Sequence, residues 1–361
     1  MQRSEAVDWL KAVGISLIVY GHVGASSTLP WTPPIYVKQL GVAFFVFATG
    51  FTLARERRAV VEALITRLFP VYLFGLAVAG LITTAGLLSG GGTTSGTGLA
   101  LSNYLPFVGG ANVVFNHFPA NPTTWYVGTY LHILVVWALW LRRERVGLRL
   151  VLGALLLEIP IRAGLIAWAG PYVAYMLLTN WMTVFLLGML WGSRTTSVTH
   201  GGASSYIAAL AGGLVASAIG WGFMNPEATF PFMTLKGVPQ TAGVFLVSTA
   251  VSILYVFATL LAFAAAQRLN SPRPVKFLAR NSLLVFLAHM PVYFTLHPLL
   301  LSTQLTYAWR TLILFVVCLL VLSLGSELVT RVINPKRLGD ALTRMLIGVR
   351  PTNPTTEAMG A

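Results

Sequence analysis

The chain has few charged residues for its length, and very few of them are acidic. Of its 361 residues, 9% are charged and 56% are hydrophobic, whereas a soluble globular chain carries about 25% charged and roughly 45–50% apolar residues. So few charges cannot cover the surface of a soluble protein, and most of the exterior must therefore face lipid. The composition excludes a soluble globular protein and indicates an integral membrane protein.

The sequence also lacks the residues that would support redox or metal chemistry. Its single cysteine, Cys318, lies inside an apolar run and has no second cysteine with which to form a disulfide. The six histidines are scattered without an HxxxH or HExxH spacing, and there is no GxSxG motif or heptad pattern. We therefore expect no redox centre, no metal site and no bound cofactor.

Long apolar runs are abundant. A membrane-spanning helix needs about 20 mostly apolar residues, and we predict an all-α polytopic membrane protein with about ten such helices. The predicted domain organisation is a single transmembrane domain over residues 1–335, followed by a basic, partly disordered tail over residues 336–361. The expected spans cover roughly residues 9–28, 39–54, 68–88, 124–141, 148–168, 174–191, 206–223, 241–266, 282–301 and 309–330.

The basic residues are distributed unevenly between these spans. Of the 24 lysines and arginines, 20 lie in segments on the same predicted side as both chain ends. Cytoplasmic segments of membrane proteins carry an excess of Lys and Arg, so both termini are predicted to be cytoplasmic. The net charge of +14 is thereby explained by orientation in the membrane, and we expect no nucleic-acid partner.

The longest loop predicted on the opposite side covers about residues 89–123. It begins with SGGGTTSGTG, which lacks the Gly-Lys-Ser/Thr ending of a phosphate-binding loop and is typical of a flexible linker. The aromatic and asparagine residues in the rest of the loop could instead line an external substrate cleft.

Three ionisable residues stand in the first span. Lys11 and His22 are eleven residues apart, which puts them on one helix face but about 16 Å apart along the axis. Asp8 precedes Lys11 by one turn, a spacing suited to an ion pair. Asp8 and Lys11 could be interfacial anchors and His22 a packing residue. Ionisable groups within spans are costly and usually face a cavity or a functional path, however, so we favour a functional role for His22.

Arginines gather just after the second span and at the start of the third. Arg55, Arg57 and Arg58 follow the apolar stretch 40–53, and Arg67 stands in the sequence TRLFPVY. Their simplest role is to orient the protein in the membrane. Closely spaced guanidinium groups also bind phosphate through bidentate hydrogen bonds, so a phosphate-bearing ligand is the alternative.

Polar residues recur in the fourth and fifth spans. Trp125 opens the fourth span and suits the outer membrane interface. Glu158 and Arg162 stand four residues apart in the fifth span, where an ion pair would lower its own cost of burial. Such a pair indicates a polar interior rather than a lipid-facing surface.

A late span carries the last polar group. Asn281 and Ser282 are expected to cap the start of a helix. His289 lies in the middle of the same span, close to Pro291, which is an unusual place for a histidine.

Together these segments resemble the membrane acyltransferase-3 family, whose polytopic members O-acylate surface carbohydrates. The first helix of the family carries a basic residue, ten intervening residues and a histidine, and Lys11 and His22 fit that spacing. The stretch FFVFATGF is similar to the family's second helix, and Arg55-Glu56-Arg57 matches its Arg-x-Arg motif. RLFP and NSLLVFLAH resemble two later motifs, and the opening RSEAVDWLKAVGISLIVYGH is similar to the fucose 4-O-acetylase-like branch.

The resemblance is incomplete in the second and fourth spans. Many relatives carry a carboxylate shortly after the tryptophan of the fourth span, where this chain has Tyr130 and His132. The FHMPLFF form of the second helix is replaced by LGVAFF.

The resemblance implies an O-acetyltransferase-type enzyme of a bacterial plasma or inner membrane. It would move an acyl group from acyl-CoA to a hydroxyl of a carbohydrate or lipid-linked glycan. His22 is then the expected general base, since an imidazole pKa near 6.5 suits that role. Lys11 is expected to stabilise the donor or a developing negative charge, and Asp8 completes the expected catalytic set. The donor-binding set is Arg55, Arg57, Arg58 and Arg67, and the acceptor-side or supporting set is Trp125, Tyr130, His132, Glu158, Arg162, Ser282 and His289.

A transporter or flippase is the alternative. Ten spans, buried charges and proline-interrupted helices are compatible with one, but such folds are commonly built from internal repeats. In this sequence the arginine clusters and the histidine-bearing spans do not recur at matching positions in the two halves. A non-catalytic membrane scaffold is a third possibility, although it would not need polar residues inside its spans. We favour the enzyme.

Overall fold

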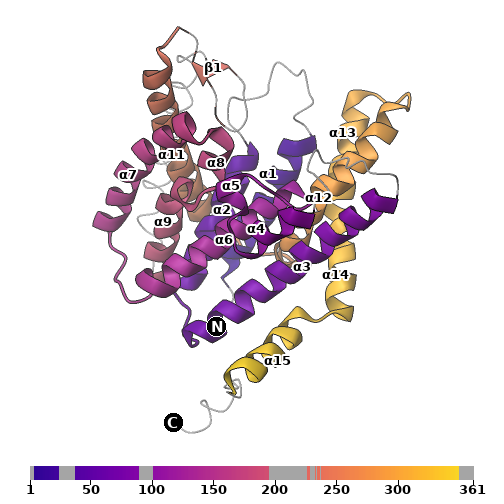
Figure 1. The fold of residues 1–361 in the computed structure, drawn as a ribbon, viewed down its shortest axis with the longest axis horizontal. Helices are drawn as coiled ribbons and strands as arrows, with labels where there is room; N and C mark the ends of the chain where they lie inside the picture. The colour runs from indigo at the N-terminus through magenta and orange to yellow at the C-terminus, as the bar shows by residue number, and fades with distance from the viewer. Residues whose placement is uncertain are drawn as a thin grey trace.

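The computed structural model describes residues 4–23, 37–88, 101–194 and 237–348, with five further residues between 226 and 235. The regular secondary structure of these residues is helical apart from one pair of two-residue antiparallel strands, which confirms the all-α prediction (Figure 1). The longer helices are α1 Glu5–Val23, α2 Val37–Leu53, α3 Val60–Leu88, α6 Trp125–Val136, α7 Leu148–Trp168, α9 Met182–Ser193, α11 Gln240–Ala266, α12 Arg273–Leu301, α13 Tyr307–Val316, α14 Leu322–Val332 and α15 Pro335–Ile347. The short elements are η1 Leu101–Asn103, α4 Tyr104–Val108, α5 Asn112–Phe115, η2 Pro122–Thr124, η3 Trp137–Leu141, α8 Pro171–Met176, η4 Leu178–Asn180, η5 Val317–Val321, β1 Pro226–Glu227 and β2 Thr234–Leu235.

Seven segments of the described chain are helical, long and apolar enough to cross a membrane. They correspond to the first, third, fourth, fifth, eighth, ninth and tenth predicted spans. The shorter apolar helices α2 and α9 correspond to the second and sixth. The predicted span 206–223 lies outside the described residues. Helices α3 and α12 begin eight and nine residues before their predicted spans, because polar turns extend them beyond their apolar runs. The prediction of one continuous span over 174–191 was wrong: α8 ends at Met176, and α9 begins only at Met182.

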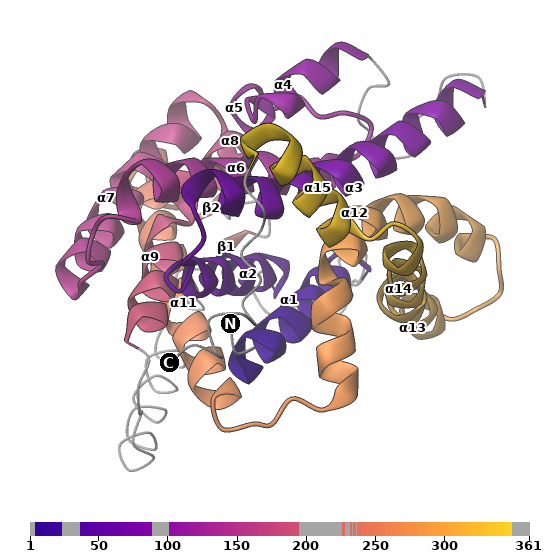
Figure 2. The same cartoon turned by 90° about the horizontal axis from the view of Figure 1, so that it is seen from below.

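Helices α1 and α2 form an antiparallel pair at the centre of the molecule. They pack on each other along their length, α12 packs on α1, and α9 packs on α2 (Figure 2). Glycine makes both of the close crossings of α2 possible. A side chain at Gly41 would collide with the backbone oxygen of Gly14 on α1, and one at Gly50 would collide with the oxygen of Phe185 on α9. Small residues allow membrane helices to approach this closely.

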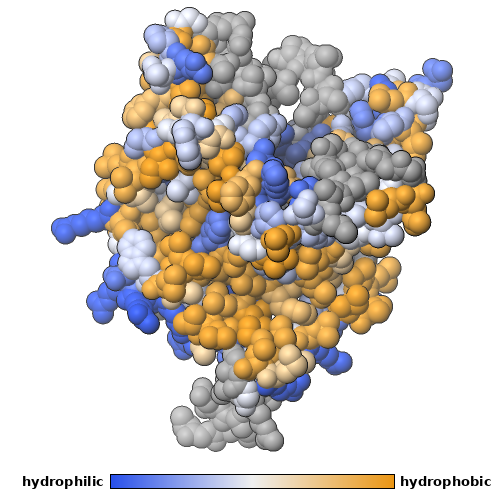
Figure 3. All heavy atoms as spheres, viewed as in Figure 1, coloured by the Kyte–Doolittle hydropathy of each residue, from blue (hydrophilic) through white to orange (hydrophobic). Residues whose placement is uncertain are grey.

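The outer helices expose large apolar side chains. Leu81, Leu156, Trp168 and Leu328 are each more than half exposed, and Figure 3 shows an apolar surface over much of one face, with hydrophilic residues gathered mainly beyond its edges. Exposed apolar surface on this scale is expected of helices that face lipid.

The basic segments collect at one end of the bundle. Lys276 before the apolar part of α12 pairs with Glu5 at the start of α1, with 3.6 Å between Nζ and Oε1. Because α2 runs antiparallel to α1, its carboxyl end and Arg55 lie at the same end as Glu5. We call this the basic end, and it agrees with the predicted clustering of arginines on one side.

Two connecting segments contain helices in their described parts. The described part of the predicted loop 89–123 contains α4, α5 and η2, while residues 89–100 lie outside the described residues. The basic tail begins as helix α15, which packs against α3. Residues 349–361 are outside the described part, so the predicted division of the chain at residue 335 stays a prediction.

Candidate functional site

The first helix places its ionisable residues as the spacing predicts. Helix α1 runs without interruption from Glu5 to Val23, so Lys11 and His22 share a face and lie about 16 Å apart along its axis. Asp8 is buried and 4% exposed, while Lys11 and His22 are partly buried. The ion pair between Asp8 and Lys11 stays a prediction. Lys11 belongs to the basic end, and His22 lies at the opposite end.

His22 meets a second histidine from a distant part of the sequence. The ring centroids of His22 and His289 are 5.1 Å apart, and His289 is 1% exposed. Lys38 at the start of α2 lies close by, since a methyl group added at Gly21 would be 2.7 Å from its Cβ. Both histidines were predicted as site residues, but the structure brings them together with Lys38, which sequence reasoning missed.

The hydrogen bonds of His289 define which of its ring nitrogens is available. Its Nδ1 lies 2.7 Å from the backbone oxygen of Phe286 and 3.2 Å from that of Val285. A carbonyl oxygen can only accept a hydrogen bond, so Nδ1 carries the proton and the neutral ring has its lone pair on Nε2. Nε2 is buried and has no hydrogen-bond partner among the described residues. His289 therefore presents an unused acceptor next to His22.

A proline in α12 explains how a distant loop is held beside His289. Pro291 has no N–H, so the backbone oxygen of Leu287, one turn earlier, receives no helical hydrogen bond. Asn121 Nδ2 and Thr123 Oγ1 donate to that oxygen instead, at 2.6 Å and 3.2 Å. The segment that precedes α6 is thereby fixed against α12 close to His289.

Aromatic residues continue from His289 toward α6. Phe286 contacts both His289 and Tyr126, with ring centroids 5.9 Å and 5.1 Å away. Tyr126 in turn contacts Trp125 at 5.8 Å and Tyr130 at 6.2 Å. The predicted residues Trp125 and Tyr130 are thus linked to His289 through two aromatic rings that were not in the predicted set. In the sequence, Tyr126 is marked only by its position next to Trp125, and Phe286 only by the helical periodicity of the late span.

Two predicted residues lie away from this group. His132 lies against Gly110, near the connection between α4 and α5. Ser282 donates to the backbone oxygen of Ala279 within its own helix, at 3.0 Å. The prediction that Asn281 and Ser282 cap a helix start was wrong, because α12 begins at Arg273. The helix extends beyond the apolar run as a polar segment that starts next to Pro272.

The predicted pair in α7 forms and is fully enclosed. Arg162 and Glu158 make an ion pair, with side chains 0% and 1% exposed. Arg162 also donates to Asn180 Oδ1 at 2.6 Å, and Glu158 accepts from the backbone N–H of Thr183 at 3.0 Å. Ser252 on α11 bonds to both charged groups. The network joins α7, the start of α9 and α11, and it supports the bundle as a structural link.

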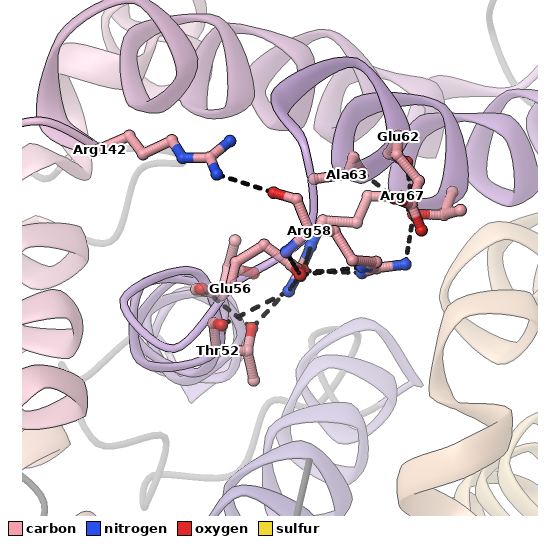
Figure 4. Close-up of polar contacts among 9 residues, drawn as sticks. Thr52, Glu56, Arg58, Glu62, Ala63, Arg67 and Arg142 are labelled. Atoms are coloured by element: carbon pink, nitrogen blue, oxygen red, sulfur yellow. Dashed lines mark hydrogen bonds and ion pairs between the residues drawn. The ribbon is translucent and has the colours of Figure 1, made fainter. Parts of the chain in front are cut away.

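At the basic end, Glu56 gathers two of the predicted donor-binding arginines (Figure 4). Arg58 Nη2 and Arg67 Nη2 lie 2.7 Å and 2.9 Å from its Oε2. Burial alone would raise the pKa of Glu56, but hydrogen bonds from Arg58 and the charge of Arg67 outweigh it and lower the pKa to about 2. The hydrogen bond with Glu56 also raises the pKa of Arg58. Arg67 therefore joins the arginine cluster as predicted, with its charge largely compensated.

The other two arginines of this set are less constrained. Arg55 donates from Nε to the backbone oxygen of Gly192 at 3.2 Å, and its guanidinium carbon lies 4.1 Å from the ring centroid of Phe51. Partial burial lowers the pKa of Arg55. Arg57 is exposed and makes no ion pair within the described ranges. Of the four, Arg57 is the most available to a ligand.

Comparison with known proteins adds one finding. A family model described as an acyltransferase domain matches residues 4–329, which include α1 with His22 and α12 with His289. No curated protein and no solved structure matches the chain.

Proposed function

The chain belongs to the acyltransferase-3 family, and on that premise we propose that this multi-pass membrane protein is an O-acyltransferase that uses acyl-CoA. The family implies an acyl donor and an acceptor. In our proposal the acyl group is acetyl and the acceptor is a hydroxyl of a carbohydrate or lipid-linked glycan. The observation that carries the proposal is the meeting of His22 with His289, whose Nε2 has no partner within the described residues.

The proposed reaction uses His22 as the general base. His22 takes the proton of the acceptor hydroxyl while the hydroxyl oxygen attacks the thioester carbonyl. The tetrahedral intermediate then collapses, the carbon–sulfur bond breaks, and the proton passes to the departing thiolate to give free CoA. An imidazole ring can accept a proton on one nitrogen and later release it, which suits both proton transfers. His289 Nε2 accepts a hydrogen bond either from His22 or from the hydroxyl, and so orients the reacting groups.

Lys11 and Lys38 lie at different distances from His22, and we therefore assign them different roles. Lys11 lies about 16 Å from His22 along α1, too far to act on an oxygen that reacts at His22. We assign Lys11 to the donor, whose long pantetheine arm passes from the basic end toward the histidines. Lys38 packs against Gly21, the residue before His22, and it is the better candidate to stabilise negative charge on the reacting oxygen.

The aromatic residues support a carbohydrate acceptor. Trp125, Tyr126, Tyr130 and Phe286 form a connected group that reaches His289. Binding sites for small molecules are commonly lined by aromatic side chains, with a few polar groups to fix orientation. Trp125 and Tyr130 are partly exposed, so they are the members of this group that an acceptor can reach.

The test is replacement of the histidine itself. His22→Ala should reduce acyl transfer by about 100-fold or more, since a positioned general base contributes roughly 10²–10⁴-fold. Activity is measured as acyl mass added to extracted glycans and lipids. The matched control is His297→Ala, which removes a histidine of α12 that stacks on Tyr293 and should leave transfer unchanged. A folded His22→Ala variant with full activity would overturn the assignment.

A further inference from the structure

A pocket of about 470 Å³ opens at the basic end, between the carboxyl ends of α2 and α9 and the connection from α6 to α7. Small-molecule sites typically have volumes of roughly 300–1,000 Å³, so the pocket is large enough for part of a ligand. Its walls are apolar at Leu53, Trp137, Leu141, Val146, Met189 and Leu190, and charged at Glu56, Arg142, Glu144, Arg145 and Arg194.

An irregular turn places Arg142 in this pocket. Residues Trp137–Leu141 form a π-helical turn, and the N–H of Arg142 bonds to the oxygen of Trp137 at 2.9 Å, five residues back. The extra residue in such a turn rotates the next residues by about 100° relative to an α-helix. Turns of this kind are frequent at functional sites. Here the turn directs Arg142 toward the cluster around Glu56.

One end of the Arg142 guanidinium is held and the other is not. Its Nη2 donates to the backbone oxygen of Arg58 at 2.7 Å (Figure 4), and its Cζ lies 5.5 Å from the ring centroid of Trp137. Its Nη1 is buried without a hydrogen-bond partner among the described residues. A buried charged donor with no acceptor is costly, and an acceptor supplied by a ligand would remove that cost.

The charge of the pocket favours an anion. Arg58 binds both oxygens of Glu56, and Arg67 binds Oε2 as well. Because neither arginine lines the pocket, the charge of Glu56 is neutralised without using any of the lining arginines. That leaves three lining arginines against one carboxylate, Glu144. Arg145 and Arg194 are exposed and make no ion pair within the part of the chain that the structure describes. Two guanidinium groups are therefore free to close on a ligand at the mouth.

We propose that this pocket binds a phosphate group of the nucleotide portion of the acyl donor. Arg142 Nη1 is the buried donor, Arg145 and Arg194 are the flexible donors at the mouth, and the apolar wall holds the uncharged parts of the ligand. Guanidinium groups recognise phosphate through charge-assisted hydrogen bonds. The inference rests on the proposed function, and it gives Arg58 and Arg67 a different task from the predicted one. They hold Glu56 and the segment whose backbone oxygen positions Arg142.

The test measures binding of adenosine 3′,5′-bisphosphate to the purified full-length chain in lipid nanodiscs by calorimetry. Arg142→Gln and Arg194→Ala should each raise Kd about tenfold or more, as expected for a lost charge-assisted hydrogen bond. Arg149→Ala, an exposed arginine of α7 outside the pocket lining, is the matched control and should leave Kd unchanged. Arg194→Ala changes an exposed residue, so it keeps the test valid if Arg142→Gln fails to fold.

Two results would overturn the inference. The first is equal affinity in the wild type and in folded Arg142→Gln and Arg194→Ala. The second is a result in which the nucleotide does not bind to the protein in zwitterionic nanodiscs, whereas phosphatidylglycerol vesicles bind to the protein through these arginines. That result would assign the pocket to lipid headgroups.

The KM for acetyl-CoA in a transfer assay separates this inference from the proposed function. Transfer that depends on His22 but whose KM is unaffected by Arg194→Ala would refute the pocket alone. Arginine-dependent nucleotide binding without any transfer would refute the acyltransfer proposal alone.

Discussion

The Glu158–Arg162 pair and the His22–His289 pair both lie between packed helices, and they differ in whether a hydrogen-bonding atom is left without a partner. In the Glu158–Arg162 pair, both charged groups are surrounded by partners from three parts of the chain. In the His22–His289 pair, Nε2 of the second histidine is buried with no partner in the described chain. A fully satisfied pair holds helices together, whereas an unsatisfied one is available to substrate. Burial of a titratable residue is therefore a weaker sign of catalysis than an unused hydrogen-bonding atom.

The strongest test of this contrast is removal of one partner of the satisfied pair. Glu158→Ala would leave the Arg162 charge buried without its counter-ion, and we expect a loss of about 3–5 kcal/mol of stability. The measurement is thermal denaturation in detergent together with the yield of folded protein. Replacing both residues, as Glu158→Gln with Arg162→Met, should cost clearly less, because no charge is then stranded. A single variant as stable as the wild type would contradict a structural role.

The opposite outcome is expected at the unsatisfied pair. His289→Phe should lower kcat by about 5–150-fold, the equivalent of roughly 1–3 kcal/mol for a lost hydrogen bond in the transition state, while Tm changes little. Phenylalanine keeps an aromatic ring of similar size but has no lone pair that can accept a hydrogen bond. Parallel measurement of kcat and Tm separates a positioning role from a packing role. Lost stability with unchanged kcat per folded molecule would show that His289 only packs.

Much of the fold could be predicted from the sequence, because lipid-facing helices must be long and apolar. The ion pair in α7 was also predictable, since residues four apart meet on one helix face. The contact between His22 and His289 was not, because the spacing within one helix carries no information about which other helix packs against it. The Arg-x-Arg motif likewise identifies two charged residues, Arg55 and Arg57. It does not predict that Glu56, which stands between them in the sequence, binds Arg58 and Arg67.

The arginine cluster permits a test by pH. The pKa of Glu56 is about 2 in the folded protein and near 4.3 in an unfolded chain. A lowered folded pKa means that the stabilisation is complete above about pH 4.3 and is lost as the pH falls toward 2. Glu56→Gln should therefore cost roughly 2 kcal/mol at pH 7, and the difference in Tm from the wild type should shrink below about pH 4. A difference that is constant with pH would show that the charge of Glu56 is not responsible.

The smallest expected effect concerns how the histidine site is supported. Asn121→Ala removes one of the two side chains that donate to the backbone oxygen of Leu287, and it should cost about 1 kcal/mol of stability. That oxygen needs an outside donor only because Pro291 has no N–H. In the Pro291→Ala background the helix supplies its own hydrogen bond, so Asn121→Ala should then cost less. The coupling energy of this double-mutant cycle is the quantity to measure. Additive effects would mean that Asn121 holds the loop through other contacts. The oxygen that Pro291 leaves without a helical donor would then not be what links the segment before α6 to the turn of α12 that carries His289.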